Sequence, residues 1–434
     1  PDPAVVGAAL QAAGSLPDPG LMRQLVSLMA DKDWGRTAER SLKRLGAVAL
    51  PVLTEASQLD RGPADRGPAE LDRRLATQVA SILGAIGTPE SQTALTRLAA
   101  VPDRQVRSAA LHALRGAPLN PADAPLIREW IGEELTLAQR LLHGTQREPF
   151  ADFVAALDYE LDVLIQRLFD LLGRLYDPET VGSVRSGVEH ASRERRANAL
   201  EMLENLITRS VYQAMQALLD EHPRAEKVRL LDAAVGPYRG TESLRAFVIE
   251  QGETLFSDWT ISVAFRHWVP SGGASRLLLP YLNHRALLVR DSAAEALRAL
   301  AANQPADFEH LHAEFPTLHA SLMSHAEAAR DRIPDYERVL VLQNTSLFAQ
   351  TPAAVLGSVT PIMKEVTYAE GQTIFNKGEL GTCMYVIHSG EVLILDGDHV
   401  LTRFGKGDFF GELALLDAEA RSATAQAGTD LRLF

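Results

Sequence analysis

Residues 410–424 read FGELALLDAEARSAT, and this stretch decides how the C-terminal part of the chain is interpreted. Gly411 permits close approach of a neighbouring backbone, and residues 412–416 are expected to form a short helix whose first N–H groups attract anions. Arg421 is expected to return beside Glu412. The pair would offer a positive fork for a phosphate and a carboxylate that accepts from hydroxyls. A ligand with a phosphate beside a ribose hydroxyl would satisfy both groups.

Short runs of strand-forming residues surround this stretch, and turn residues separate them. The runs are residues 373–376, 384–387, 391–396, 399–404, 422–427 and 431–434. The turns are residues 376–378, 389–390, 396–398 and 405–407. Regularly spaced short strands that are separated by turn residues predict a β-barrel or jelly roll. A helix is expected before them, over residues 335–342.

Three ordered motifs resemble the cyclic nucleotide-binding domain of catabolite activator proteins, cyclic-nucleotide-dependent kinases and gated channels. They are residues 368–378 (YAEGQTIFNKG), residues 384–392 (MYVIHSGEV) and residues 410–424. The resemblance runs from residue 347 to residue 434. It implies that Glu412 accepts the ribose 2′-OH, that the backbone N–H groups of Leu413 and Ala414 hold the phosphate, that Arg421 pairs with its charge, that Ser422 adds a contact and that Gly411 makes room.

The resemblance leaves the base and the end of the domain open. Members of the family follow their last strand with a helix that caps the base, and this chain stops at Phe434. We therefore expect a C-terminally incomplete domain. Cyclic AMP is favoured over cyclic GMP, although Ser422 could suit guanine. The alternative is a folded spacer that binds no nucleotide, and the presence of both Glu412 and Arg421 argues against it.

The long N-terminal part shows a recurring helical template, with apolar or small residues at positions i, i+4 and i+8. The copies are Trp34, Ala38 and Leu42; Leu75, Val79 and Leu83; Val106, Ala110 and Leu114; Val289, Ala293 and Leu297; and a weaker copy at Arg195, Ala199 and Leu203. In three copies an arginine follows the first position, as Arg107, Arg196 and Arg290. The spacing fits a period of about 30 residues once residues 60–69 (DRGPADRGPA) are read as a loop insertion.

A period of about 30 to 45 residues with two helices per unit is typical of an α-solenoid. The copies at residues 106–114 and 289–297 resemble HEAT repeats, which implies a superhelix that docks a protein partner. The predicted fold is therefore multidomain. An all-α, HEAT-like solenoid over residues 1–332 is followed by a helical linker over 333–346 and by the cyclic nucleotide-binding domain over 347–434.

Composition and charge limit the other possibilities. The chain has 434 residues, of which 6% are aromatic. Its 43 Lys and Arg against 56 Asp and Glu give a net charge of -13. This acidic balance argues against nucleic acid as a partner. The single cysteine, Cys383, favours a reducing, cytoplasmic location and is expected to be a small buried residue in a strand. No apolar run approaches the roughly 18 residues that a membrane helix needs.

We expect a regulatory protein and not an enzyme, because no catalytic constellation is present. Four histidines, His310, His312, His319 and His325, lack the spacing of a metal site, and neither a cofactor nor a metal is expected. The predicted partners are a cyclic nucleotide and a protein on the solenoid surface. The chain starts at Pro1 and also resembles bacterial nucleotide-transporter-like membrane proteins through residues 168–176 and 195–203, so a membrane domain is expected before this segment. The alternative function is a constitutive scaffold.

Overall fold

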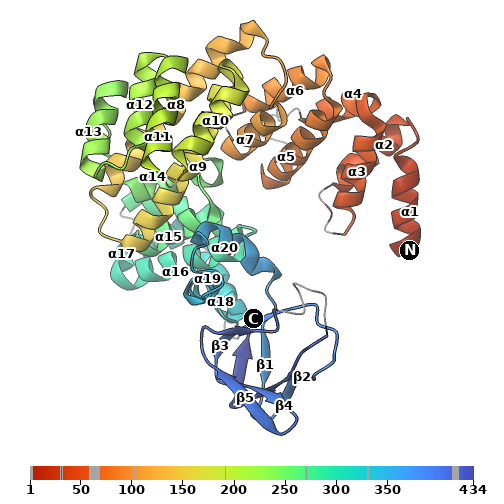
Figure 1. Ribbon diagram of the computed structural model, residues 1–434. Helices are drawn as coiled ribbons and strands as arrows, with labels where there is room; N and C mark the ends of the chain where they lie inside the picture. The colour runs from red at the N-terminus through yellow and green to blue at the C-terminus, as the bar shows by residue number, and fades with distance from the viewer. Residues whose placement is uncertain are drawn as a thin grey trace. The chain divides into compact units, whose positions relative to one another are not determined.

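The computed structural model describes the chain except for residues 1–2, 30, 32, 58–68, 102, 191, 269–271, 330–331 and 413–419. In the described part, 20 α-helices precede eight strands (Figure 1). The chain divides into two compact units. Unit 1 comprises Pro1–Arg147 with Leu161–Thr241, and unit 2 comprises Glu148–Glu160 with Glu242–Phe434. The predicted loop insertion at residues 60–69 lies almost wholly outside the described residues.

Unit 1 is helical. Its elements are α1 (Pro3–Ala13), α2 (Pro19–Leu28), α3 (Gly35–Leu45), α4 (Leu50–Ser57), α5 (Ala69–Ile86), α6 (Pro89–Ala99), α7 (Arg104–Ala113), α8 (Ala124–Thr145), the C-terminal part of α9 (Ala151–Leu175), α10 (Pro178–Val188), α11 (Arg193–Leu206), α12 (Arg209–Leu219) and α13 (Arg224–Val235). Polar caps start several of them. Asp18, Thr88 and Asp177 each accept a backbone N–H from the first turn of α2, α6 and α10, and a proline follows each cap.

Helices in the first half of unit 1 pack in two series. Helices α1, α3, α5 and α7 pack one against the next, and α2, α4 and α6 do the same, while α5, α6 and α7 also pack as sequence neighbours. The helical template marks the buried face of the five helices that contain it, α3, α5, α7, α11 and, in unit 2, α16 (Leu287–Asn303). Its second and third positions are at most 3% exposed in all five copies: Ala38, Leu42, Val79, Leu83, Ala110, Leu114, Ala199, Leu203, Ala293 and Leu297.

The contact between α5 and α7 depends on the absence of a side chain at Gly84. A Cβ added there would lie 2.8 Å from the Cβ of Ala113 and 3.1 Å from its Cα. We expect Gly84→Ala to lower the free energy of unfolding by about 1–2 kcal/mol, because overpacking outweighs the gain in helix propensity. Gly132→Ala in α8 is the control, since nothing lies within 4 Å of its added Cβ. The control should raise stability by about 0.5–1 kcal/mol, and denaturant unfolding of both variants checks the difference in sign.

Unit 2 combines helices and sheets. Its remaining helices are α14 (Leu244–Gln251), α15 (Asp258–His267), α16 (Leu287–Asn303), α17 (Pro305–Glu314), α18 (Leu318–Ala329), α19 (Asp335–Asn344) and α20 (Ala353–Val359). Its strands are β1 (Val366–Tyr368), β2 (Thr373–Phe375), β3 (Tyr385–Ser389), β4 (Val392–Asp396), β5 (His399–Phe404), β6 (Phe409–Phe410), β7 (Thr424–Ala427) and β8 (Leu431–Leu433). The expected helix at residues 335–342 is α19, and the six expected strands are present, most with shifted ends. Sequence reasoning missed the short strands β1 and β6.

The strands form two four-stranded antiparallel sheets, in the orders β1-β8-β3-β6 and β2-β7-β4-β5. Among the described residues these sheets do not close into a barrel, so the barrel part of the prediction is wrong. The reason is the pairing within the described strands: β1 pairs only with β8, β6 pairs only with β3, and the second sheet likewise ends at β2 and β5.

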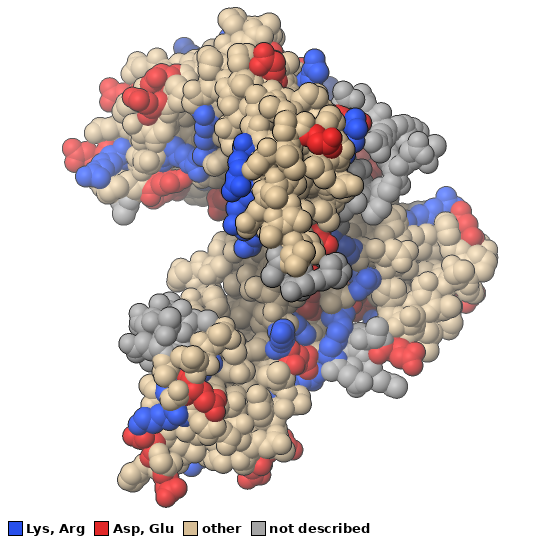
Figure 2. Space-filling view, turned by 90° about the vertical axis from the view of Figure 1, so that its right-hand side faces the viewer, with Lys and Arg blue, Asp and Glu red and all other residues tan. Residues whose placement is uncertain are grey.

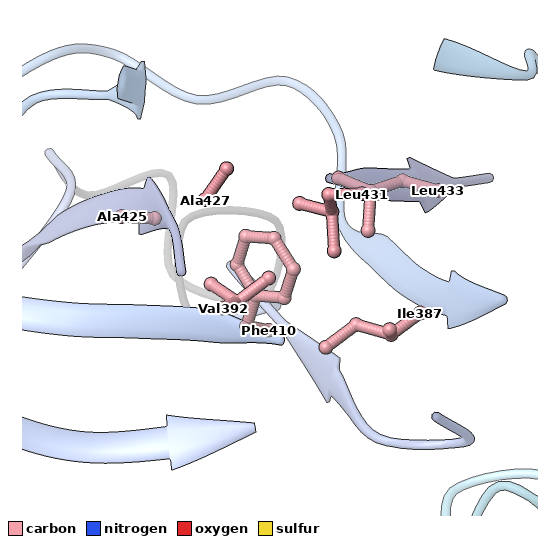
Figure 3. Packing of buried hydrophobic residues seen from close by; sticks show 7 residues of the cluster. All are labelled: Ile387, Val392, Phe410, Ala425, Ala427, Leu431 and Leu433. Carbon is pink, nitrogen blue, oxygen red and sulfur yellow. The ribbon is translucent and has the colours of Figure 1, made fainter. Parts of the chain in front are cut away.

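The core of the sheets lies between their inner faces. Figure 3 shows the Phe410 ring beside Val392 and close to side chains of β7 and β8. Seven buried residues form this cluster: Ile387, Val392, Phe410, Ala425, Ala427, Leu431 and Leu433. Because side chains alternate between the faces of a strand, residues two apart on β7 and on β8 point the same way into this core.

The surface carries charges of both signs. Figure 2 shows Lys and Arg interspersed with Asp and Glu on the face it draws, where residues of other types cover most of the area. None of the described helices is both long and apolar enough to span a bilayer.

Candidate functional site

A cavity of about 380 Å³ lies against the β-rich part of unit 2. Its lining comes from β2, β4, β5 and β6, from residues on both sides of 413–419, and from the segment between α19 and α20. The lining residues are Ser346, Phe375, Ile394, Thr402, Phe404, Asp408, Phe409, Phe410, Gly411, Glu412, Ala420, Arg421, Ser422 and Ala423. The structure therefore brings four of the six predicted site residues to one cavity: Gly411, Glu412, Arg421 and Ser422. Leu413 and Ala414, and most of the short helix expected at 412–416, lie outside the described residues.

Arg421 is charged but only 6% exposed, and its contacts hold it in a fixed position. Its Nη1 donates to the carbonyl oxygen of Gly411 at 2.6 Å, and its Nη2 donates to that of Cys383 at 2.7 Å. Its guanidinium carbon lies 4.2 Å from the centre of the Phe375 ring, within the range of a cation–π contact. A guanidinium has five N–H donors, and these two carbonyls use two of them. The other donors can serve an anion.

Two glycines make the space that Arg421 occupies. A Cβ on Gly381 would lie 2.4 Å from the guanidinium carbon, and a Cβ on Gly411 would lie 2.5 Å from Nη1. Gly411 also has φ +82°, which residues other than glycine rarely adopt. The sequence suggested the role of Gly411 in making room, but it offered no signal for Gly381, which is far from Arg421 along the chain.

The backbone ties Arg421 to the segment that contains Gly381. The N–H of Arg421 donates to the carbonyl of Glu379 at 2.8 Å, and the N–H of Gly378 donates to the carbonyl of Arg421 at 2.8 Å. Residues Leu380 and Ala420 form an antiparallel bridge beside them. Arg421 is therefore positioned by its main chain as well as by its side chain.

Glu412 and Ser422 face the same cavity without a fixed partner. Among the described residues, neither side chain makes a hydrogen bond or an ion pair, and Ser422 is exposed. A half-buried carboxylate and an exposed hydroxyl can both accept from a ligand, and the hydroxyl can also donate. The cavity thus combines a held cation with an available acceptor.

Aromatic side chains form the apolar wall behind Arg421. The rings of Tyr385 and Phe410 stack at 5.2 Å, and Phe375 lies 5.8 Å from Phe410. Burial raises the pKa of Tyr385, and the neighbouring Cys383 thiol raises it further.

Cys383 is exposed and lies before β3, so the prediction of a buried residue within a strand is wrong. Its carbonyl accepts from Arg421 in place of a strand partner.

Comparisons with known proteins identify the C-terminal part of the chain. The family model of the cyclic nucleotide-binding domain matches residues 365–434, and this part of the chain is therefore a cyclic nucleotide-binding domain. The chain is 34% identical over 100 residues to a cGMP-dependent protein kinase of Eimeria tenella, a match that covers 23% of this chain and 10% of the kinase. It is 37% identical over 76 residues to a cAMP-dependent protein kinase regulatory subunit of Schizosaccharomyces pombe, covering 17% of this chain and 18% of that subunit.

A solved structure, the regulatory domain of Toxoplasma gondii PKA with cAMP, is 30% identical with a TM-score of 0.22 and covers 23% of this chain and 40% of that one. The chain spans only 10% and 18% of the two kinase-related proteins that it matches. The likeness concerns the C-terminal domain, and most of the helices that precede it lie outside the matched part.

Several lining residues escaped sequence reasoning. Phe375, Ile394, Thr402 and Phe404 come from three strands of one sheet, and Ser346 comes from the turn between α19 and α20. The strands were predicted. Which face of each strand lines the cavity depends, however, on how the sheet packs against residues 410–424. No local pattern in the sequence contains that information.

Proposed function

We propose that the cavity at Arg421 binds a cyclic nucleotide, and that this binding regulates the helical part of the chain. One observation carries the proposal: Arg421 and Glu412 line the same cavity, one as a held cation and the other as an available acceptor. A cyclic nucleotide carries one phosphate charge and one ribose 2′-OH, which these two groups match. Ser422 would add a contact, and Leu413 and Ala414 would donate from their backbone. The proposal ranks cyclic AMP above cyclic GMP and assigns the chain no catalytic activity.

The size of the cavity and the chemistry of the ligand set the scale of binding. A volume of about 380 Å³ lies within the range of small-molecule sites. A ligand of about 22 heavy atoms at about 0.3–0.4 kcal/mol per atom would bind with a Kd in the micromolar range. The apolar wall of Phe375 and Phe410 would exclude water from the phosphate pair and so strengthen it.

Helix α19 is the proposed connection between the domain and the helices before it. Tyr336 stacks on Trp259 of α15 with ring centres 5.0 Å apart, and its hydroxyl donates to Asp152 of α9 at 3.1 Å. The next two residues point to the β-rich part. Glu337 accepts from His388 at 2.9 Å, and Arg338 donates to the carbonyl of Met363 at 3.2 Å. A change on either side of α19 would therefore reach the other.

The helical part is proposed to be a HEAT-like solenoid that binds a protein partner. The support is the packing of α1, α3, α5 and α7 in one series and of α2, α4 and α6 in another, which is how stacked helix pairs bury their faces. The proposal includes a cytoplasmic location, which the single cysteine favours. It also includes a membrane domain in the complete protein, for which the support is the resemblance to transporter-like proteins.

A second candidate function is a constitutive scaffold in which the β-rich domain binds no nucleotide. The contacts of Arg421 favour it, because the side chain already donates to the carbonyls of Gly411 and Cys383. In that case Arg421 would act as a structural clamp. The two functions differ in whether nucleotide binds at all, and calorimetry with cyclic AMP and cyclic GMP separates them.

Glu412→Gln tests the ribose contact. Because Glu412 has no partner among the described residues, the change should leave stability unaltered. It should weaken cyclic AMP binding by roughly tenfold, because the acceptor of the ribose hydroxyl loses its charge. Titration calorimetry measures the affinity. Asp398→Asn, in the exposed turn between β4 and β5, is the matched control and should bind as the wild type does.

The ligand can be varied as well as the protein. In the wild type, 2′-deoxy cyclic AMP should bind at least as weakly as cyclic AMP binds to Glu412→Gln. Combining the deoxy ligand with the variant should add little further loss, because both changes act on the same hydrogen bond. Losses that add in full would contradict the assignment of Glu412 to the 2′-OH, and a wild type that binds neither nucleotide would leave the scaffold as the function.

A further inference from the structure

A second cavity of about 380 Å³ lies among the helices of unit 2 and plays no part in the proposed nucleotide site. It is lined by Leu287, Arg290 and Asp291 of α16, by Ser324 and His325 of α18, and by Arg332 before α19. Two arginines and one hydroxyl thus line the cavity together with Asp291, the one carboxylate among its described lining residues. This is an excess of hydrogen-bond donors and of positive charge.

Arg290 lacks the kind of partner that its equivalents have. The helical template places an arginine after its first position at Arg107, Arg196 and Arg290. Arg107 pairs with Glu133 and Arg196 pairs with Glu221, and each also donates to a backbone carbonyl. Arg290 makes no hydrogen bond or ion pair through its side chain to any residue that the structure describes. Arg290 instead lines the cavity.

Arg332 contributes a second donor that is not satisfied. Its Nη2 pairs with Asp291, but its Nη1 is buried and has no hydrogen-bond partner among the described residues. A buried donor without an acceptor is costly. Asp335, a further carboxylate near this pair, is 3.6 Å from Arg338 and also lies within the electrostatic reach of Arg332. Arg332 Nη1 and the Arg290 side chain therefore remain without a hydrogen-bond acceptor among the described residues.

The rest of the wall also suits an anion. Leu287 is the first residue of α16, whose N-cap is Ala286 and whose first turn holds no acidic residue, so its first N–H groups lack a side-chain acceptor. The ring of His325 lies 2.6 Å from the carbonyl oxygen of Ser321 and 2.8 Å from that of Leu282. These contacts hold the ring in place against the wall.

We propose that this cavity binds a phosphate group, with Arg290 and Arg332 as the ligand-binding residues and Ser324 as a further donor. Two guanidinium forks match the oxygens of a phosphate better than those of a smaller anion. The cavity is large enough for inorganic phosphate or for the phosphate of a small organic ester. Asp291 competes with the ligand for Arg332.

Titration calorimetry of the full chain tests this site, with inorganic phosphate against chloride at equal ionic strength as the first probe. Ribose 5-phosphate against ribose then distinguishes an ester from free phosphate as the preferred source. Arg290→Gln should weaken phosphate binding by roughly tenfold or more. Asp291→Asn should tighten it, because the competing carboxylate is gone. If Asp291→Asn instead bound phosphate more weakly than the wild type, the result would contradict the assignment of this cavity as a phosphate site.

Two controls complete the experiment. Arg298→Gln removes the same charge from an exposed position on the same helix and should leave phosphate binding unchanged. The titrations are also run in an Arg421→Ala background, which removes phosphate binding at the proposed nucleotide site, so that the remaining heat reports on this cavity. No heat from phosphate beyond that from chloride, or an equal loss in Arg290→Gln and Arg298→Gln, would overturn the proposal.

Discussion

Arg421→Ala is expected to weaken the binding of cyclic AMP by roughly a hundredfold, because the variant loses the charged fork that pairs with the phosphate. The guanidinium is held beside the cavity by the carbonyls of Gly411 and Cys383, so little ordering remains to be done when the ligand binds. Titration calorimetry measures the loss. Arg403→Ala, an exposed arginine of β5 that pairs with Glu391, is the matched control and should change the affinity little.

The same substitution also affects stability, and this must be separated from binding. Removing Arg421 leaves two carbonyl acceptors without their donor, which should cost about 1–3 kcal/mol. Gly381→Ala provides an independent test, because its Cβ would lie 2.4 Å from the guanidinium carbon and displace it while the arginine remains. Both variants should bind weakly and yet fold, as far-UV circular dichroism would show. Folded Arg421→Ala with unchanged affinity would rule out the phosphate role.

Glu134→Ala is expected to cause the largest loss of stability, about 3–5 kcal/mol, because it leaves two buried arginines without their carboxylate. Glu134 is fully buried in α8. It accepts from Arg104 at 3.0 Å and from Arg167 at 3.0 Å and 3.2 Å. Burial lowers the pKa of Arg104, and the same desolvation makes an unpaired charge costly here.

The neighbouring residue supplies the control for this experiment. Glu133 lies on the same helix and pairs with Arg107, but its side chain is 48% exposed. Its single partner, Arg107, is buried but keeps its hydrogen bond to the carbonyl of Ala99, so Glu133→Ala should cost less than Glu134→Ala. Denaturant unfolding measures the loss of stability in each variant. Equal losses would mean that the burial of Glu134 with its two arginines adds nothing to stability. Replacing all three charged residues by apolar ones of similar size should recover most of the stability.

The sequence was sufficient to predict features that depend on local order. Six strands and α19 were found because alternation, glycine turns and helical periodicity are local signals. The buried positions of the template, such as Val79 and Leu83, were found for the same reason. The strands β1 and β6 were missed because runs of two or three residues carry no clear period. The barrel was predicted wrongly because closure depends on which edge strands meet.

The candidate site divides in the same way. The sequence by itself determined that Glu412 and Arg421 are present at the spacing of a phosphate-binding segment, and that the domain around them has the cyclic nucleotide-binding pattern. Only the tertiary structure decided that Gly381 makes space for Arg421, and that Phe375 lies under it. The same limit applies to the helices. Arg107 and Arg290 hold the same position of the template, but Arg107 pairs with a carboxylate and Arg290 lines a cavity. Periodicity states which face of an element is buried, but the residue across from it is set by packing between segments distant in the chain.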